Sequence, residues 1–171
     1  MIPDIQLQLK AAIKSLRDNV LPAVDPHNEL AQQQMQLAMA TIEIAMNNLP
    51  AIHRVLRTDI EQHVLMAQDM EEVLAGTETG LKLASLVHEA EISLQDPSLG
   101  FVQLQLAARM LRSGIGDVIA ANAEGEAAEA LEQIVLAHSD DSLALGRALN
   151  KPMGFESSPD DVSDISSLVD S

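Results

Sequence analysis

The sequence predicts an all-α fold, an antiparallel bundle of five to seven helices. Apolar residues recur at three- and four-residue spacing along most of the chain, which is typical of amphipathic helices. Prolines and short polar turns divide the chain into segments of helix length, and short loops favour antiparallel neighbours. Only 1% of the 171 residues are aromatic, which disfavours a β-sandwich. We expect a helical bundle domain over residues 1–150 and a flexible acidic tail over residues 151–171.

The first two predicted helices are separated by a break that contains prolines. The first covers about residues 4–20, and its apolar stripe is Ile5, Leu9, Ala12 or Ile13, Leu16 and Val20. The second follows Asp25 and Pro26, which we interpret as an N-cap and a proline in the first turn, and ends near residue 48. Its apolar stripe is Ala31, Met35, Ala38, Ile42, Ala45 and Leu49. A helix this apolar is expected to contact several neighbours.

The third and fourth helices are expected over residues 50–75 and about 79–95, with Gly76 just beyond the end of the third. Aspartate followed by proline occurs again at positions 96 and 97, before the fifth helix. The inward stripe of the fifth helix is Phe101, Leu104, Ala108, Leu111, Ile115 and Val118. Gly114 and Gly116 interrupt it, and each costs up to about 1 kcal/mol against alanine. We expect them to allow close helix packing or to mark a bend.

The last part of the bundle is expected to hold two helices. A sixth helix covers residues 123–138, and Ser139, Asp140 and Asp141 resemble a new cap before a short helix that ends at Leu149. From Lys151 onward the sequence holds five acidic residues and six serines. Such a segment has too few large apolar groups to form a core of its own, so it is expected to be flexible.

The charge and composition exclude several classes of function. The chain has 10 Lys and Arg against 26 Asp and Glu, a formal net charge of −16, which repels phosphate backbones and excludes direct nucleic-acid binding. It has no cysteine, so disulfides, thiolate catalysis and iron–sulfur clusters are excluded. No uninterrupted apolar run of about 18 residues is present, which predicts no membrane span. With no targeting segment visible, we expect a bacterial-type cytoplasmic protein.

A carboxylate-bridged iron centre, the best-known activity of helical bundles, is not expected here. That centre requires Glu-x-x-His on paired helices, so that both ligands face inward from adjacent turns. The residues three positions before the five histidines are all non-acidic: Val24, Pro50, Ile60, Ser85 and Val135. We therefore predict neither a metal site nor another cofactor.

Asp59 and His63 are the candidate catalytic pair. They are four residues apart on the third predicted helix, and a carboxylate at that spacing can orient an imidazole for acid–base work. The alternative is a pair at the edge of the core with no catalytic role. No nucleophile motif such as Gly-x-Ser-x-Gly accompanies the pair, so the sequence favours a protein that is not an enzyme.

Two arginine pairs are candidate ligand-binding residues. Arg54 and Arg57, and likewise Arg109 and Arg112, are three residues apart, so each pair faces one way on its helix. Arginines can grip a phosphate or carboxylate in forked geometry, and the pairs together could hold an acyl-coenzyme A or nucleotide-like group. The alternative is ion pairing within the chain to its many acids.

Two other features suit binding to a protein partner. Six methionines lie at helical spacings and are expected in the core, or alternatively in an adaptable groove for an acyl chain or a partner helix: Met35, Met39, Met46, Met66, Met70 and Met110. In the tail, Val162, Ile165 and Leu168 have the spacing of a short amphipathic helix that forms on binding. The alternative is a tail that only solvates the protein.

The motif Val20-Leu21-Pro22-Ala23, between an amphipathic first helix and an Ala- and Met-rich second helix, carries a resemblance. Over roughly residues 5–50 the chain resembles a group of small all-helical bacterial proteins of unknown function. Those proteins are encoded beside phosphotransferase-like and acyl-coenzyme A dehydrogenase-like enzymes. The resemblance implies an accessory role near acyl or phosphoryl metabolism, and it transfers no catalytic residue.

The sequence thus favours a non-catalytic helical binding or accessory protein that acts through protein–protein contacts or self-association. One alternative is a small-ligand protein or enzyme that holds an anionic group on the arginine pairs. Another is an acidic decoy for a basic protein surface, since the net charge is −16.

Overall fold

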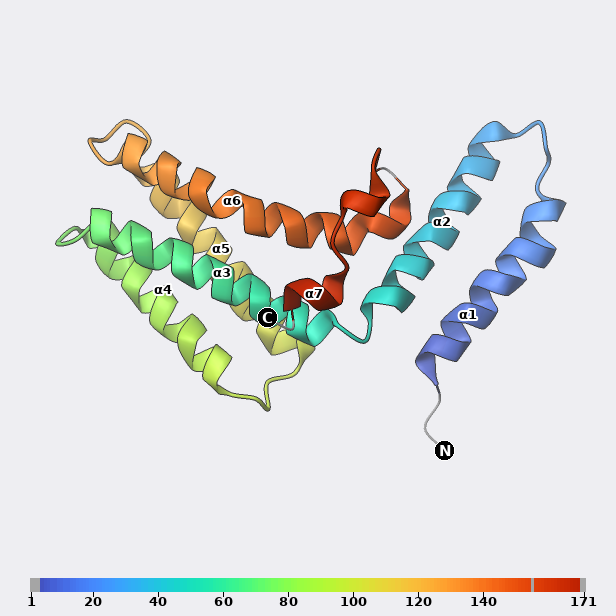
Figure 1. Ribbon diagram of the computed structural model, residues 1–171, viewed down its shortest axis with the longest axis horizontal. Helices are drawn as coiled ribbons and strands as arrows, with labels where there is room; N and C mark the ends of the chain where they lie inside the picture. The colour runs from blue at the N-terminus through green and yellow to red at the C-terminus, as the bar shows by residue number, and fades with distance from the viewer. Residues whose placement is uncertain (1–3, 155, 170–171) are drawn as a thin grey trace. The chain divides into compact units, whose positions relative to one another are not determined.

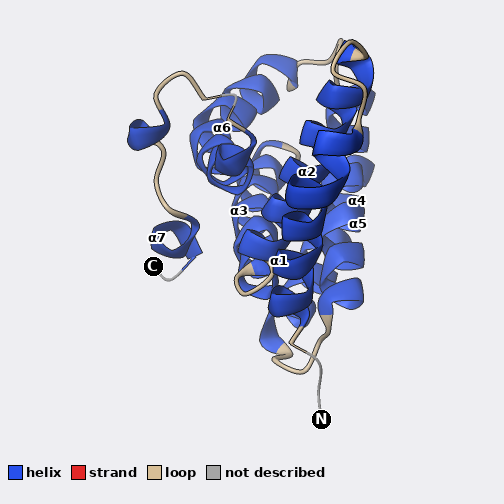
Figure 2. Cartoon of the chain, turned by 90° about the vertical axis from the view of Figure 1, so that its right-hand side faces the viewer, coloured by secondary structure: helices blue, strands red, loops and turns tan. Residues whose placement is uncertain are grey.

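The computed structural model describes residues 4–154 and 156–169, and within them all regular structure is helical (Figures 1 and 2). The predicted all-α bundle is therefore confirmed. The described α-helices are α1 (Ile5–Ser15), α2 (Glu29–Asn48), α3 (Ile52–Val73), α4 (Glu78–Gln95), α5 (Phe101–Ala121), α6 (Ala128–Asn150) and α7 (Ile165–Val169). In this part of the chain no helix is long and apolar enough to span a membrane.

The helices belong to two compact units. The first unit comprises residues 1–50 and 147–164, and the second comprises residues 51–146 and 165–171. The domain boundary predicted after residue 150, and the flexibility of the chain beyond it, remain predictions.

In the first unit, α1 packs against α2. The side chain of Asp4 caps α1 by accepting a hydrogen bond from the Leu7 amide at 3.0 Å. Helix α1 is followed by a π-helical turn, η1 (Leu16–Val20), and then by a 3₁₀ turn, η2 (Leu21–Ala23). These two turns precede the loop that leads to α2. The interior of this unit is small, because α1 and α2 bury only Ile13 and Met39.

Residues beyond α6 also contribute to the first unit. The 3₁₀ turn η3 (Lys151–Met153) packs against α2. The Lys151 ammonium donates to the Val162 carbonyl at 2.9 Å, beyond a second 3₁₀ turn, η4 (Pro159–Asp161). Arg147 and Glu156 form an ion pair at 2.8 Å. Arg147 of α6 thus holds Glu156 of the acidic segment, while Lys151, the first residue of that segment, holds Val162.

In the second unit, α3, α4 and α5 all pack against one another. The side chains with no more than 2% exposure lie in their shared core, together with Leu131 of α6: Ile60, Ala67, Met70, Leu74, Leu83, Ala90, Leu104, Ala108 and Leu111. The inward stripe predicted for the fifth helix is confirmed from Leu104 to Val118, whereas Phe101 is 44% exposed. The main hydrophobic core of the chain is therefore in this unit.

The turn between α3 and α4 explains how closely these helices approach. Gly76 has a φ of 80°, a conformation that glycine adopts without a Cβ clash. Thr77 then caps α4 by accepting from the Gly80 amide at 3.0 Å. A Cβ on Gly80 would lie 2.4 Å from the Leu74 carbonyl oxygen, so only glycine fits there.

The two Asp-Pro signals were wrongly predicted as helix caps. The Asp25 and Asp96 carboxylates accept hydrogen bonds from the amides of His27 at 2.9 Å and Ser98 at 2.8 Å. Each aspartate therefore closes a local turn, in which its side chain competes with helical bonding. Helix α2 begins later, after Asn28, whose side chain caps it.

The break predicted at residues 139–141 is also wrong, because α6 is one continuous helix over Ala128–Asn150. The Ser139 hydroxyl donates to the Val135 carbonyl one turn earlier at 2.6 Å. A serine that bonds back in this way continues a helix instead of capping a new one. The acidic residues that follow it, Asp140 and Asp141, are exposed on the helix surface.

Candidate functional site

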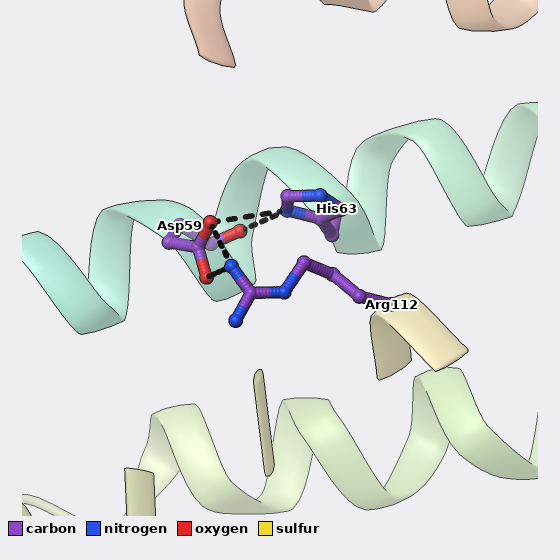
Figure 3. Close-up of polar contacts among 3 residues, drawn as sticks. All are labelled: Asp59, His63 and Arg112. Atoms are coloured by element: carbon purple, nitrogen blue, oxygen red, sulfur yellow. Dashed lines mark hydrogen bonds and ion pairs between the residues drawn. The ribbon is translucent and has the colours of Figure 1, made fainter. Parts of the chain in front are cut away.

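Asp59 and His63 do form the pair that their spacing predicts, and Arg112 of α5 joins them (Figure 3). The His63 Nδ1 lies 2.7 Å from the Asp59 backbone carbonyl oxygen and 3.5 Å from its carboxylate. The Arg112 Nη1 donates to both carboxylate oxygens of Asp59, at 3.2 and 3.1 Å. The cluster joins α3 to α5 through charge-assisted hydrogen bonds.

The hydrogen bonds fix the roles of the ring nitrogens of His63. A backbone carbonyl only accepts, so the Nδ1 of His63 carries the proton that is donated to Asp59. Among the described residues, the Nε2 of His63 has no hydrogen-bond partner. The side chains of Asp59 and His63 are only 16% and 14% exposed, while that of Arg112 is 46% exposed. The cluster thus has a shielded carboxylate and a guanidinium open to solvent.

His63 and Arg112 lie on the wall of a cleft of about 510 Å³ between α3, α5 and α6. The other lining residues are Met66, Ile115, Gly116, Ile119, Val135, Ser139, Ser142 and Leu143. Ser142 is notable because its hydroxyl is buried and has no hydrogen-bond partner. Buried polar atoms without a partner are uncommon in folded proteins, and they mark places where a bound molecule can supply one.

The four predicted ligand-binding arginines do not all reach this cleft. Arg112 lines it. Arg57 donates instead to the carbonyls of Leu94 at 2.7 Å and Asp96 at 2.5 Å, and so fixes the end of α4 to α3. Arg54 and Arg109 are exposed on α3 and α5. The sequence pattern placed each pair on one face of a helix, but it could not show which guanidinium the backbone would engage.

The second unit has further polar contacts outside the Asp59, His63 and Arg112 cluster. His138 pairs with Asp69 at 2.7 Å. Gln68 donates a hydrogen bond to the Glu91 carboxylate at 2.9 Å. Burial raises the pKa of the Glu71 carboxyl, and the negative charge of Glu91 raises it further. Among the described residues, no three metal-ligating side chains are grouped so that they could hold a metal ion.

The tail residues proposed to bind a partner are largely covered by the chain itself. Val162 is 6% exposed. Ile165 and Leu168 are half-buried in α7, which packs against α3. Their role in partner binding remains a prediction, and it would require these residues to leave their present contacts.

The outer surface of α5 carries an apolar stripe that the sequence analysis missed. Val102, Leu106 and Met110 are 69%, 57% and 45% exposed at four-residue spacing. Leu106 and Met110 also line a groove of about 170 Å³ between α4 and α5, whose other lining residues are Leu86, Glu89, Ala90, Ser93, Gln103, Ala107 and Leu111. We name Val102, Leu106 and Met110 the α5 stripe.

The signal for the α5 stripe was available in the sequence. Met110 was expected in the core with the other methionines, of which Met39, Met66 and Met70 are indeed buried. The fifth helix has two apolar repeats, one starting at Leu104 and the other at Val102. A helix that packs against two neighbouring helices buries one of its faces and leaves the other exposed. The second repeat therefore indicates an exposed apolar face.

Searches of protein-family models, of curated proteins and of solved structures find no match to this chain.

Proposed function

We propose that this protein is a non-catalytic helical module that acts as a dimer, and that a second copy binds along the α5 stripe. The observation that carries the proposal is the α5 stripe itself, three large apolar side chains in a row at 45% exposure or more. Apolar surface gains free energy when it is removed from water, and a contiguous row of it is typical of an interface. The accessory role implied by the resemblance remains a separate prediction.

The stripe is self-complementary. If two α5 helices pack antiparallel with Leu106 on the two-fold axis, Val102 of one copy lies opposite Met110 of the other. Each contact then occurs twice, as in any two-fold interface. The groove beside the stripe provides space into which side chains of the second helix can pack, as ridges into grooves.

The local charge also suits a second copy. The chain is strongly acidic, but residues 97–116 contain no Asp or Glu. Two α5 helices that pack along this stripe therefore bring no carboxylate of this segment against each other.

Size-exclusion chromatography with light scattering tests the proposal. At tens of micromolar, the full chain is expected at twice its 18.4 kDa mass. Leu106→Glu places a charge at the centre of the interface and is expected to give a monomer. Leu136→Glu is the matched control, because Leu136 of α6 is 58% exposed and lies outside the stripe. A monomeric wild-type chain, or equal loss of the dimer in both variants, would contradict the proposal.

A further inference from the structure

The cleft between α3, α5 and α6 has a mostly apolar lining that includes a few polar side chains. The apolar wall consists of Met66, Ile115, Ile119, Val135 and Leu143. A volume of about 510 Å³ falls within the range of small-molecule sites, roughly 300–1,000 Å³. The apolar lining suits a hydrocarbon chain, and a polar group of the ligand must therefore contact the polar lining residues His63, Arg112, Ser139 or Ser142.

The polar side chains of the lining offer hydrogen-bond donors that are not used within the described chain. Arg112 binds Asp59 through Nη1 alone, so its Nη2 and Nε remain available for a ligand oxygen. The buried Ser142 hydroxyl has no partner and can also donate to such an oxygen. Two donors of this kind favour a group with two acceptor oxygens.

The charges of the cluster point to a carboxylate. The negative charge of Asp59 and the positive charge of Arg112 balance each other. Arg112 keeps unused donors in the forked geometry that matches the two oxygens of a further carboxylate.

We infer that this cleft binds a medium-chain carboxylic acid. The carboxylate accepts hydrogen bonds from Arg112 and Ser142, and the hydrocarbon chain covers the apolar wall. The inference does not rest on the proposed dimer, because the cleft and the α5 stripe have no lining residue in common.

Isothermal titration calorimetry on the full chain tests the head group. Decanoate, kept below its micellar concentration, is expected to bind. Decan-1-ol and decyltrimethylammonium have the same tail with a neutral and a cationic head, and both are expected to bind at least tenfold more weakly. No binding of decanoate up to millimolar concentration, or equal affinity for the three probes, would overturn the inference.

Two neighbouring arginines test the assigned donor. Arg112→Gln is expected to weaken decanoate binding at least tenfold, whereas Arg109→Gln, three residues away on α5, should leave it unchanged. Ser142→Ala removes the second donor without disturbing the ion pair, and a loss of about threefold is expected. If Arg112→Gln lowers stability, Ser142→Ala still decides, since full affinity in that variant contradicts the assigned role of Ser142.

A glycine on the cleft wall tests the position of the tail. Gly116 lines the cleft, and a Cβ added there would meet nothing within 4 Å. Gly116→Leu is therefore expected to fill the cleft and abolish binding in a folded protein. Gly146→Leu is the control, because that position also has open space but does not line the cleft. Undiminished binding in Gly116→Leu would place the ligand elsewhere.

Discussion

The helices of the two units have similar apolar spacing in the sequence, but they bury different numbers of residues. In the second unit, α3, α4 and α5 bury six, four and six residues, whereas α1 and α2 of the first unit bury one residue each. The apolar stripe of α2 is nevertheless as regular in sequence as that of α5. The comparison shows that periodicity predicts a helix, while the number of helices packed around it decides how much of its stripe is buried.

The largest expected effect is the loss of a core side chain in the second unit. Leu104 of α5 is completely buried. Leu104→Ala is expected to lower the free energy of unfolding by about 2–5 kcal/mol, because it removes buried methyl groups and leaves a cavity. Urea unfolding followed by circular dichroism measures this change.

The matching substitution in the first unit is Ile42→Ala, at a half-buried position of the α2 stripe. It is expected to lower the free energy of unfolding by less than about 1.5 kcal/mol. The folded chain buries less apolar surface at Ile42 than at Leu104, so less buried surface is lost on truncation. Equal losses of unfolding free energy for Ile42→Ala and Leu104→Ala would contradict the difference in burial between the two units.

Much of the second unit was predictable from the sequence. The inward stripe predicted for the fifth helix contains Leu104, Ala108 and Leu111, all of which are buried. The caps and the break at residue 139 were not predictable, because Asp25, Asp96 and Ser139 each have several local hydrogen-bonding options. Which option is used depends on where the neighbouring backbone lies.

The candidate site was predictable only in part. The four-residue spacing of Asp59 and His63 places both on one face of α3, and the structure confirms the contact. Arg112 is 53 residues from Asp59, so its ion pair depends on how α5 packs against α3. The unpartnered hydroxyl of Ser142 likewise appears only when α6 is in place.

The next prediction concerns the two glycines of α5, which the sequence could not distinguish. A Cβ on Gly114 would lie 2.1 Å from the Leu86 side chain of α4, whereas a Cβ on Gly116 would meet nothing. Gly114→Val is expected to destabilise the second unit by about 1–3 kcal/mol through overpacking. Gly116→Val is expected to raise stability by a few tenths of a kcal/mol, since valine has the higher helix propensity.

Thermal unfolding of both glycine variants gives the sign of each effect. A stabilised Gly114→Val variant would mean that Leu86 can move aside at no cost. The contact of α4 with α5 would then be looser than the close packing at Gly114 indicates.

The smallest effects are pH-dependent and have opposite signs in the two units. In the second unit, burial and the charge of Glu91 raise the pKa of Glu71 above its ordinary value of 4.5. The folded state therefore carries a penalty at neutral pH that disappears as the pH falls through that raised pKa. Glu71→Gln is expected to increase stability at pH 7 by less than about 1 kcal/mol, with the gain vanishing in acid.

Glu156 of the first unit is the matched carboxylate with the opposite shift. Its hydrogen bonds from Arg147 lower the pKa of Glu156 below 4.5. The resulting stabilisation is present above pH 4.5 and is lost as the pH falls through the lowered pKa. Glu156→Gln is therefore expected to lower the unfolding temperature slightly at pH 7 and to match the wild type once the pH has fallen below the lowered pKa of Glu156. If both variants shift the unfolding temperature in the same direction at pH 7, the two carboxylates do not lie in the opposite environments that the structure assigns to them.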